Sequence, residues 1–198
     1  HARSLRTDQR HPGIPAGVLD ELSTTFLSSD LDLRALMSAL LKHDAFYSTD
    51  AKQGLVRSPV EWMVALGHHT GISFDGLGAS WIGERMGQSL FNPPNVAGWK
   101  SNAYWLNTSA LSGRAQVARG VTWHLRQNDG FANLSALSVA DAVDFVANYF
   151  GIAPLSTTTR NALIAAHQAE RSAQPWVSWW APTNLLTMAM LTPEMHMA

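Results

Sequence analysis

Apolar residues recur along this chain with the period of an α-helix and almost nowhere with that of a β-strand. The clearest series, Leu33, Leu36, Met37, Leu40 and Leu41, repeats at intervals of three and four residues, which places these side chains on one helix face. No long segment rich in β-branched residues alternates between apolar and polar side chains, so the sequence contains no candidate β-strands. The pattern predicts an all-α fold, a compact bundle or array of about seven to eight helices joined by short loops.

Helix boundaries are marked by residues that satisfy free backbone groups. Ser58-Pro59-Val60-Glu61 combines a serine cap, a proline at the first helical position and a glutamate three residues after the cap, which together predict a helix start. Ser138 and Ser156 are suited to cap two later helices. Residues 1–13 lack a helical pattern, and we interpret them as a lead-in segment before one helical domain over residues 14–198.

The composition excludes several classes of protein. The 198 residues hold 14 Lys and Arg against 15 Asp and Glu, a formal charge of −1, which argues against a nucleic-acid partner. The chain has no Cys, so disulfides, Cys-ligated zinc and thiol nucleophiles are excluded within it. No run of about 18 apolar residues is present, and we expect no transmembrane segment. Because the sequence begins with His1 rather than Met, we interpret it as a processed product or a fragment.

Tryptophan is abundant while charge is low. Charged residues make up 15% of the chain, against about 25% in an average globular protein. This combination indicates either a large aromatic core or an aromatic surface that binds a partner or a sugar. We expect most of the indoles in the core, because most of them lie within helical patterns. The tryptophans are Trp62, Trp81, Trp99, Trp105, Trp123, Trp176, Trp179 and Trp180.

The longest stretch without helical periodicity, residues 89–103, contains Phe91-Asn92-Pro93-Pro94-Asn95-Val96-Ala97-Gly98-Trp99. Two adjacent prolines restrict the backbone and remove two N–H donors, so we expect one long, stiff and ordered Pro/Asn/Gly/Trp loop. We interpret it as a rigid plug on the bundle, with Trp99 buried and Arg114 donating hydrogen bonds to loop carbonyls. The alternative is a ligand platform of stacking indoles and polar side chains. The candidate binding residues are Asn92, Asn95, Trp99, Trp105, Asn107 and Arg114.

This loop and the segment after it resemble the C-terminal signature of the DUF1800 family, bacterial proteins of unassigned function. The similarity covers residues 91–99, then Trp105-Leu106-Asn107-Thr108-Ser109-Ala110-Leu111 and Arg114. Two further segments, Leu36 to Tyr47 and Leu55-Val56-Arg57-Ser58-Pro59-Val60-Glu61, are also similar to family elements. The family usually continues with Pro-Gly-Gly after the Gly-Trp pair, where this chain has Lys100-Ser101-Asn102.

The resemblance implies a wider context for the chain. It implies that the chain is the C-terminal part of a longer protein that carries an export signal, and therefore a periplasmic or extracellular location. Family members are often encoded beside a sulfatase-like protein of the DUF1501 type, so the resemblance also implies a protein partner of that type.

No complete catalytic motif is present. Gly76-Leu77-Gly78-Ala79-Ser80-Trp81 lacks the third glycine of a dinucleotide-binding fingerprint and follows no predicted strand. The adjacent His68 and His69 diverge on a helix, so they are badly placed to hold one metal ion. We therefore expect no metal and no cofactor, and the sequence identifies no catalytic residue.

Three hypotheses for the function follow. The first is a helical interaction or scaffolding module of an exported bacterial protein. The second is the C-terminal part of an enzyme, such as a hydrolase, whose catalytic residues lie mainly in a missing N-terminal portion. The third is carbohydrate binding through tryptophan residues. A pocket that gathers titratable side chains would favour an enzyme, and two coplanar exposed indoles would favour sugar binding.

Overall fold

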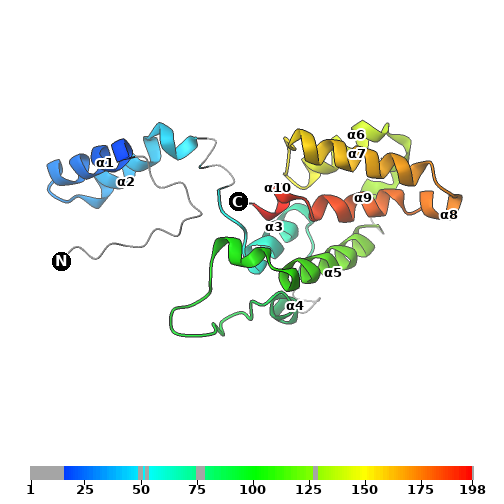
Figure 1. Cartoon of the computed structure of the whole chain (residues 1–198), viewed down its shortest axis with the longest axis horizontal. Coiled ribbons are helices and arrows are strands. Elements are labelled where there is room, and N and C mark those ends of the chain that lie inside the picture. Colours follow the sequence, from blue (N-terminus) through cyan, green and yellow to red (C-terminus); the bar gives the residue numbers. More distant parts are fainter. Residues whose placement is uncertain (1–15, 49–50, 52–53, 75–78, 127–128, 198) are drawn as a thin grey trace. The chain divides into compact units, whose positions relative to one another are not determined.

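The computed structural model confirms the all-α fold (Figure 1). Within the residues that it describes, every regular element is helical, and the one isolated bridge pairs Val56 with Met197. The chain divides into two compact units, residues 1–52 and 53–198. The predicted boundary between a lead-in segment and a helical domain lies outside the described residues. The described residues are 16–48, 51, 54–74, 79–126 and 129–197.

The first unit contains α1 (Ala16–Ser28), α2 (Leu33–Lys42) and the 3₁₀ helix η1 (Asp44–Tyr47). Helix α1 packs against α2. Between α2 and η1, the Nε2 atom of His43 lies 3.1 Å from Oε2 of Glu21, which belongs to α1. None of the side chains described between residues 17 and 48 is buried. The predicted apolar stripe of α2 is therefore helical, but it does not form a core within this unit.

The second unit contains the remaining helices. The predicted capping box begins α3: Oγ of Ser58 accepts a hydrogen bond from the Glu61 N–H, and Oε2 of Glu61 accepts one from the Ser58 N–H. Ser138 and Ser156 cap α6 and α7, as predicted. In chain order the elements are α3 (Pro59–Thr70), α4 (Ala79–Arg85), η2 (Asn102–Leu106), α5 (Thr108–Leu125), η3 (Asp129–Ala136), α6 (Val139–Tyr149), α7 (Thr157–Arg171), α8 (Pro175–Ser178), α9 (Ala181–Met190) and α10 (Pro193–His196).

Helix α9 lies at the centre of the second unit. It packs against α5, α6 and α7, and Figure 1 shows it between α5 and the α6–α7 pair. One continuous core of buried side chains extends from Trp62 in α3 to Met195 in α10. Among the described residues, no helix is both long and apolar enough to cross a membrane. The buried residues of α9 are Ala181, Leu185, Leu186, Ala189 and Met190.

The close packing of α4 against α5 depends on a glycine. A Cβ atom at Gly113 of α5 would lie 2.5 Å from Cγ of Met86 and 3.4 Å from the carbonyl oxygen of Arg85. Two turns farther along the same helix, a Cβ atom at Gly120 would have no neighbouring atom within 4 Å. The helix therefore carries one glycine that the packing requires and one that it does not.

We predict opposite effects for the same substitution at these two glycines. Gly113→Ala should lower the free energy of unfolding by about 1–3 kcal/mol, because the new methyl group overpacks the contact with Met86. Gly120→Ala should raise it by up to about 1 kcal/mol, because alanine favours the helix and meets open space. Urea unfolding of both variants measures the difference, and a change of the same sign in both would contradict this account.

Candidate functional site

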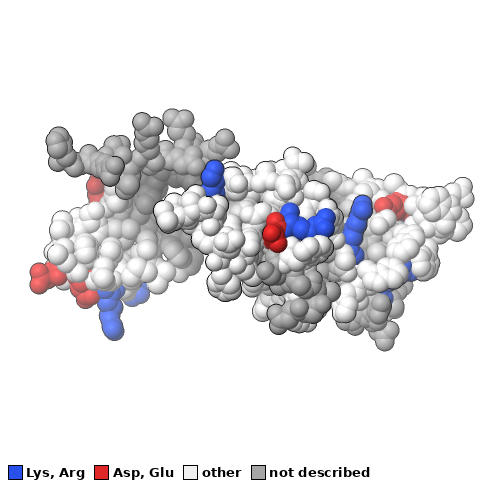
Figure 2. Space-filling view, turned by 90° about the horizontal axis from the view of Figure 1, so that it is seen from below, with Lys and Arg blue, Asp and Glu red and all other residues white. Residues whose placement is uncertain are grey.

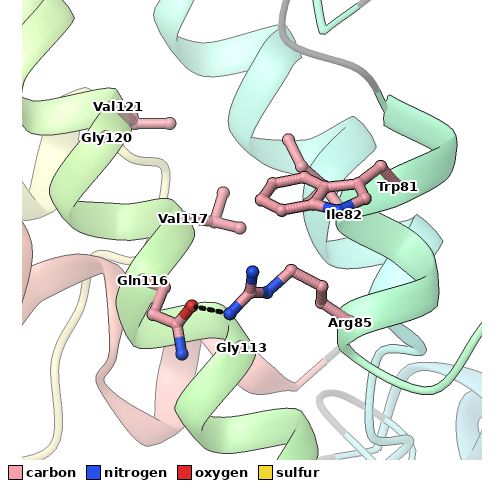
Figure 3. A pocket seen from close by; sticks show the side chains of 8 residues that line it. All are labelled: Trp81, Ile82, Arg85, Gly113, Gln116, Val117, Gly120 and Val121. Atoms are coloured by element: carbon pink, nitrogen blue, oxygen red, sulfur yellow. Dashed lines mark hydrogen bonds between the residues drawn. The ribbon is translucent and has the colours of Figure 1, made fainter.

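A groove of about 360 Å³ lies between α4 and α5. Figure 3 shows the side chains of Trp81 and Arg85 on α4 facing Gln116 and Val117 on α5. Ile82 and Val121 are buried and belong to the core of the unit, so the floor of the groove is apolar. The lining residues are Trp81, Ile82, Arg85, Gly113, Gln116, Val117, Gly120 and Val121.

The rim of the groove is polar on one side. The Nη2 atom of Arg85 donates a hydrogen bond of 2.7 Å to Oε1 of Gln116, and its Cζ atom lies 4.7 Å from the ring centre of Trp81. The Trp81 side chain is 57% exposed, so an indole surface is open to solvent beside the apolar floor. An apolar floor with an indole and a guanidinium at its edge suits an apolar group that also presents hydrogen-bond acceptors.

No site at the groove residues was predicted from the sequence. The residue types that line the groove are common in packed helices. The groove itself lies where α4 meets α5 at Gly113 and Gly120, which contribute no side chains. Two glycines within one strong helical pattern are the only signal that the sequence contains, because glycine is unfavourable inside a helix unless packing or function requires it.

The predicted plug is wrong. Phe91 and Val96 are fully exposed, the intervening loop residues are exposed as well, and Trp99 is only half-buried. The loop satisfies backbone groups by itself: Oδ1 of Asn95 accepts a hydrogen bond of 2.9 Å from the Ala97 N–H, and the Asn95 carbonyl accepts one from Gly98. A loop that bonds within itself and to water does not need to pack on the bundle.

Two asparagines after the loop have structural contacts. Oδ1 of Asn102 accepts a hydrogen bond of 2.9 Å from the Val56 N–H. Asn102 stands where the family usually has glycine, and its φ of 55° lies in the left-handed region that glycine adopts readily. Asn107 caps α5 by accepting a hydrogen bond of 2.9 Å from the Ala110 N–H, and its Nδ2 donates to the Tyr104 carbonyl.

The remaining predicted site residues lie in the core. Trp105 is 2% exposed, and Arg114 is completely buried. The Nη2 atom of Arg114 donates a hydrogen bond of 2.6 Å to the carbonyl of Arg57, just before α3, rather than to the predicted loop. The candidate residues therefore differ in exposure, since Asn92 and Asn95 lie on an exposed loop while Trp105 and Arg114 are buried. The role of the six residues in binding stays a prediction.

Several basic groups of the second unit have lowered pKa values. Burial, and then the charge of Arg57, lower the pKa of Arg114 to about 10. Burial, and then the charges of Arg114 and Arg57, together lower the pKa of His196 in α10 to about 4. The pKa of His69, at the end of α3, is lowered by burial, by His68 and by Arg57. Each of these shifts is toward the neutral form, because an additional positive charge is poorly solvated and repelled, but with a pKa of about 10 Arg114 remains charged at neutral pH.

The tryptophans are divided between core and surface. Trp62 and Trp105 are buried, whereas Trp81, Trp123, Trp176 and Trp179 are exposed, so the expectation that most indoles lie in the core is wrong. Near the end of α5, the Cζ atom of Arg126 lies 3.5 Å and 4.3 Å from the ring centres of Trp179 and Trp180.

Metal-ligating side chains are scattered through the described part of the chain. Within it, no group of three or more His, Asp or Glu residues could hold a metal ion. The rings of His68 and His69 meet edge to face, with their centres 5.4 Å apart. The expectation that the chain uses neither metal nor cofactor stays a prediction.

Trp105 and Trp99 provide a matched test of burial. We predict that Trp105→Ala lowers the free energy of unfolding by about 3–5 kcal/mol, because a fully buried indole leaves a large cavity. Trp99→Ala should cost only about 1 kcal/mol, as is typical of a partly exposed position. Thermal or urea unfolding of the two variants measures the difference. Equal losses of unfolding free energy would indicate that Trp99 is buried as fully as Trp105.

His196 predicts a pH dependence of stability. Its native pKa of about 4 lies below the ordinary value of 6.5, so the unfolded chain binds the proton more readily. The stability contributed by neutral His196 is complete above about pH 7 and is lost as the pH falls toward 4, by about 3 kcal/mol in all. His196→Gln should remove this loss, and urea unfolding between pH 7 and 4 measures it.

The control for this experiment is His124→Gln, which changes an exposed histidine of α5. It should leave the wild-type pH dependence unchanged. Some dependence should persist in His196→Gln, because burial lowers the pKa of His69 and of His167 as well. The account fails if the profiles of the wild-type chain and His196→Gln are parallel.

Comparison with known proteins agrees with the resemblance found in the sequence. No curated protein and no solved structure matched the chain. A family model described as "Protein of unknown function (DUF1800)" matches residues 2–197, which is nearly the whole chain. The chain therefore belongs to the DUF1800 family.

Proposed function

We propose that this chain is a helical interaction module of an exported bacterial protein, and that the groove between α4 and α5 receives an apolar segment of a protein partner. The observation that supports this proposal is the groove itself, with its apolar floor and the exposed indole of Trp81 at its edge. Protein interfaces have apolar centres in which tryptophan and arginine are enriched, and both residue types line this groove.

The chemistry of the groove favours a segment that combines apolar side chains with backbone carbonyls. The apolar side chains would cover Ile82, Val117 and Val121. The guanidinium of Arg85, held by Gln116 and the face of Trp81, would donate a hydrogen bond to a carbonyl at the rim. On the face that Figure 2 shows, charged side chains are few and most of the described surface is uncharged, so burying much of such a surface would desolvate few charges.

The partner and the location rest on the family resemblance. We propose a DUF1501-type protein as the partner, and a periplasmic or extracellular location for the complex. Fractionation of cells that express the full natural protein tests the location, because recovery in the cytoplasmic fraction alone would contradict export.

The carbohydrate alternative has less support from the geometry. A sugar platform needs open, coplanar indole faces, whereas the rings of Trp179 and Trp180 are inclined at 85° to each other. The guanidinium of Arg126 lies over both rings. No observation on the described residues favours the hydrolase alternative, since no cluster of catalytic side chains accompanies the groove.

A binding experiment can test the groove with a matched pair of variants at one position. The chain is co-expressed with the DUF1501-type protein from the same genome, and the affinity of the purified complex is measured by calorimetry. We expect Gly120→Leu to weaken binding at least about tenfold, the effect of about 1.4 kcal/mol, because the side chain enters open space in the groove. Gly120→Ala should bind like the wild type.

Two tryptophan variants complete the test. Trp81→Ala removes the indole at the groove and should weaken binding, whereas Trp176→Ala removes an exposed indole of α8 and should not. The absence of a complex with the wild-type chain would contradict the partner. A complex that Gly120→Leu and Trp81→Ala leave intact would contradict the groove.

A further inference from the structure

A second cavity, of about 330 Å³, lies beside the short helix α8, which Figure 1 shows at the turn between α7 and α9. Its lining comes from η3, the end of α7, the α8 segment and the start of α9. It shares no lining residue with the groove between α4 and α5, so the two sites can be tested separately. The lining residues are Ser135, Arg171, Pro175, Ser178, Trp179 and Pro182.

Trp179 supplies an open aromatic surface to this cavity. The residue is 60% exposed, although the guanidinium of Arg126 lies over its ring, with Cζ 3.5 Å from the ring centre. The ring of Trp180 meets it edge to face, with the ring centres 4.7 Å apart. The Trp179 N–H donates a hydrogen bond of 3.1 Å to the carbonyl of Pro175, which fixes the backbone from which the indole projects. The indole is therefore held in place while much of its surface stays open to a ligand.

A guanidinium dominates the polar part of the cavity. Arg171 is the last residue of α7 and is half-buried. Its Nη1 and Nη2 atoms donate hydrogen bonds of 2.7 Å and 3.0 Å to the carbonyls of Leu137 and Ser135. These bonds hold the group in one orientation, and because a guanidinium has further N–H donors, it can also donate to a ligand.

The charge around the cavity is positive. None of the described lining residues carries a carboxylate, and no ion pair joins Arg171 or Arg126 to a carboxylate within the described part of the chain. Glu170, the neighbour of Arg171 in the sequence, accepts a hydrogen bond of 3.0 Å from Asn184 through Oε1. Two guanidinium groups therefore contact or line the surface around Trp179, and they complement a negatively charged ligand.

We propose that this cavity binds an extended segment of a protein partner in which an acidic residue lies next to a proline. The carboxylate accepts hydrogen bonds from Arg171, and the proline ring stacks on the open surface of Trp179. Pro175 and Pro182 complete the apolar part of the lining. Proline-containing segments suit such a surface because they are already extended and lose little conformational freedom on binding.

An anionic polysaccharide shares the negative charge but matches the lining less well. Its hydroxyl groups need acceptors, whereas the guanidinium of Arg171 can only donate. Among the described lining side chains, the hydroxyl groups of Ser135 and Ser178 are the only acceptors. Tryptophan and arginine are instead the residue types that dominate binding at protein interfaces, which favours a peptide.

The first test measures the binding of a short, fluorescently labelled peptide of alternating glutamate and proline by anisotropy. We expect saturable binding that weakens at least about tenfold when glutamine replaces glutamate, and also when glycine replaces proline. Added salt should weaken binding, because it screens charges that are partly exposed. The absence of binding, or equal affinity for the glutamate and glutamine peptides, would overturn the proposal.

Matched variants locate the site. Trp179→Ala should weaken peptide binding at least about tenfold, whereas Trp176→Ala removes an exposed indole that does not line the cavity and should bind like the wild type. Arg171→Gln should abolish the preference for glutamate over glutamine, and Arg119→Gln, at an exposed arginine of α5, should retain it. If Arg171→Gln does not fold, Trp179→Ala decides the matter: unchanged peptide affinity in that variant would overturn the proposal.

Polygalacturonate provides the comparison with an anionic polysaccharide. At equal ionic strength, we expect it to displace the labelled peptide no better than sodium chloride does. Binding of polygalacturonate that Trp179→Ala abolishes, in a chain that does not bind the glutamate–proline peptide, would overturn the proposal in favour of a polysaccharide.

Discussion

The second unit depends on the burial of α9 between α5, α6 and α7. Its buried side chains connect helices that are distant in the sequence, and the same core continues into α3 through Trp62 and into α10 through Met195. Such a core prevents each surrounding helix from sliding along its axis or rotating about it, because close-packed interiors tolerate little displacement. The position of α5 is thereby determined, and both the groove and the buried Arg114 are built on that helix.

Two faces of helix α5 make different contacts. Toward α4 it presents Gly113 and Gly120, and the missing side chains allow close contact at one glycine and leave an open groove at the other. Toward α3 it presents Arg114, whose hydrogen bond to the Arg57 carbonyl joins α5 to the segment before α3. The groove and the hydrogen bond of Arg114 therefore lie on different sides of one helix.

The burial of Arg114 near Arg57 lowers the stability of the fold. Burying Arg114 with two nitrogen atoms unpartnered and Arg57 nearby opposes folding, and the large apolar core around Trp62 offsets that cost. Replacing a buried charge with an apolar residue of similar volume often stabilises a protein.

Local signals in the sequence were sufficient for the helices. The capping box of Ser58 and Glu61 and the serine caps of α6 and α7 depend on residues three positions apart, so backbone chemistry alone determined them. The site depended on distant contacts. Arg114 could be recognised as a donor for orphan carbonyls, but its partner, the Arg57 carbonyl, lies 57 residues away.

Exposure was likewise decided by tertiary structure. Trp99 and Trp105 have similar chemistry and lie close together in the sequence, yet Trp105 is buried and Trp99 is only half-buried. The sequence by itself determined where α3, α6 and α7 begin, because caps act within one or two turns. Only the tertiary structure decided which indoles are covered, where a groove opens and which charges meet, because those depend on how helices distant in the sequence pack together.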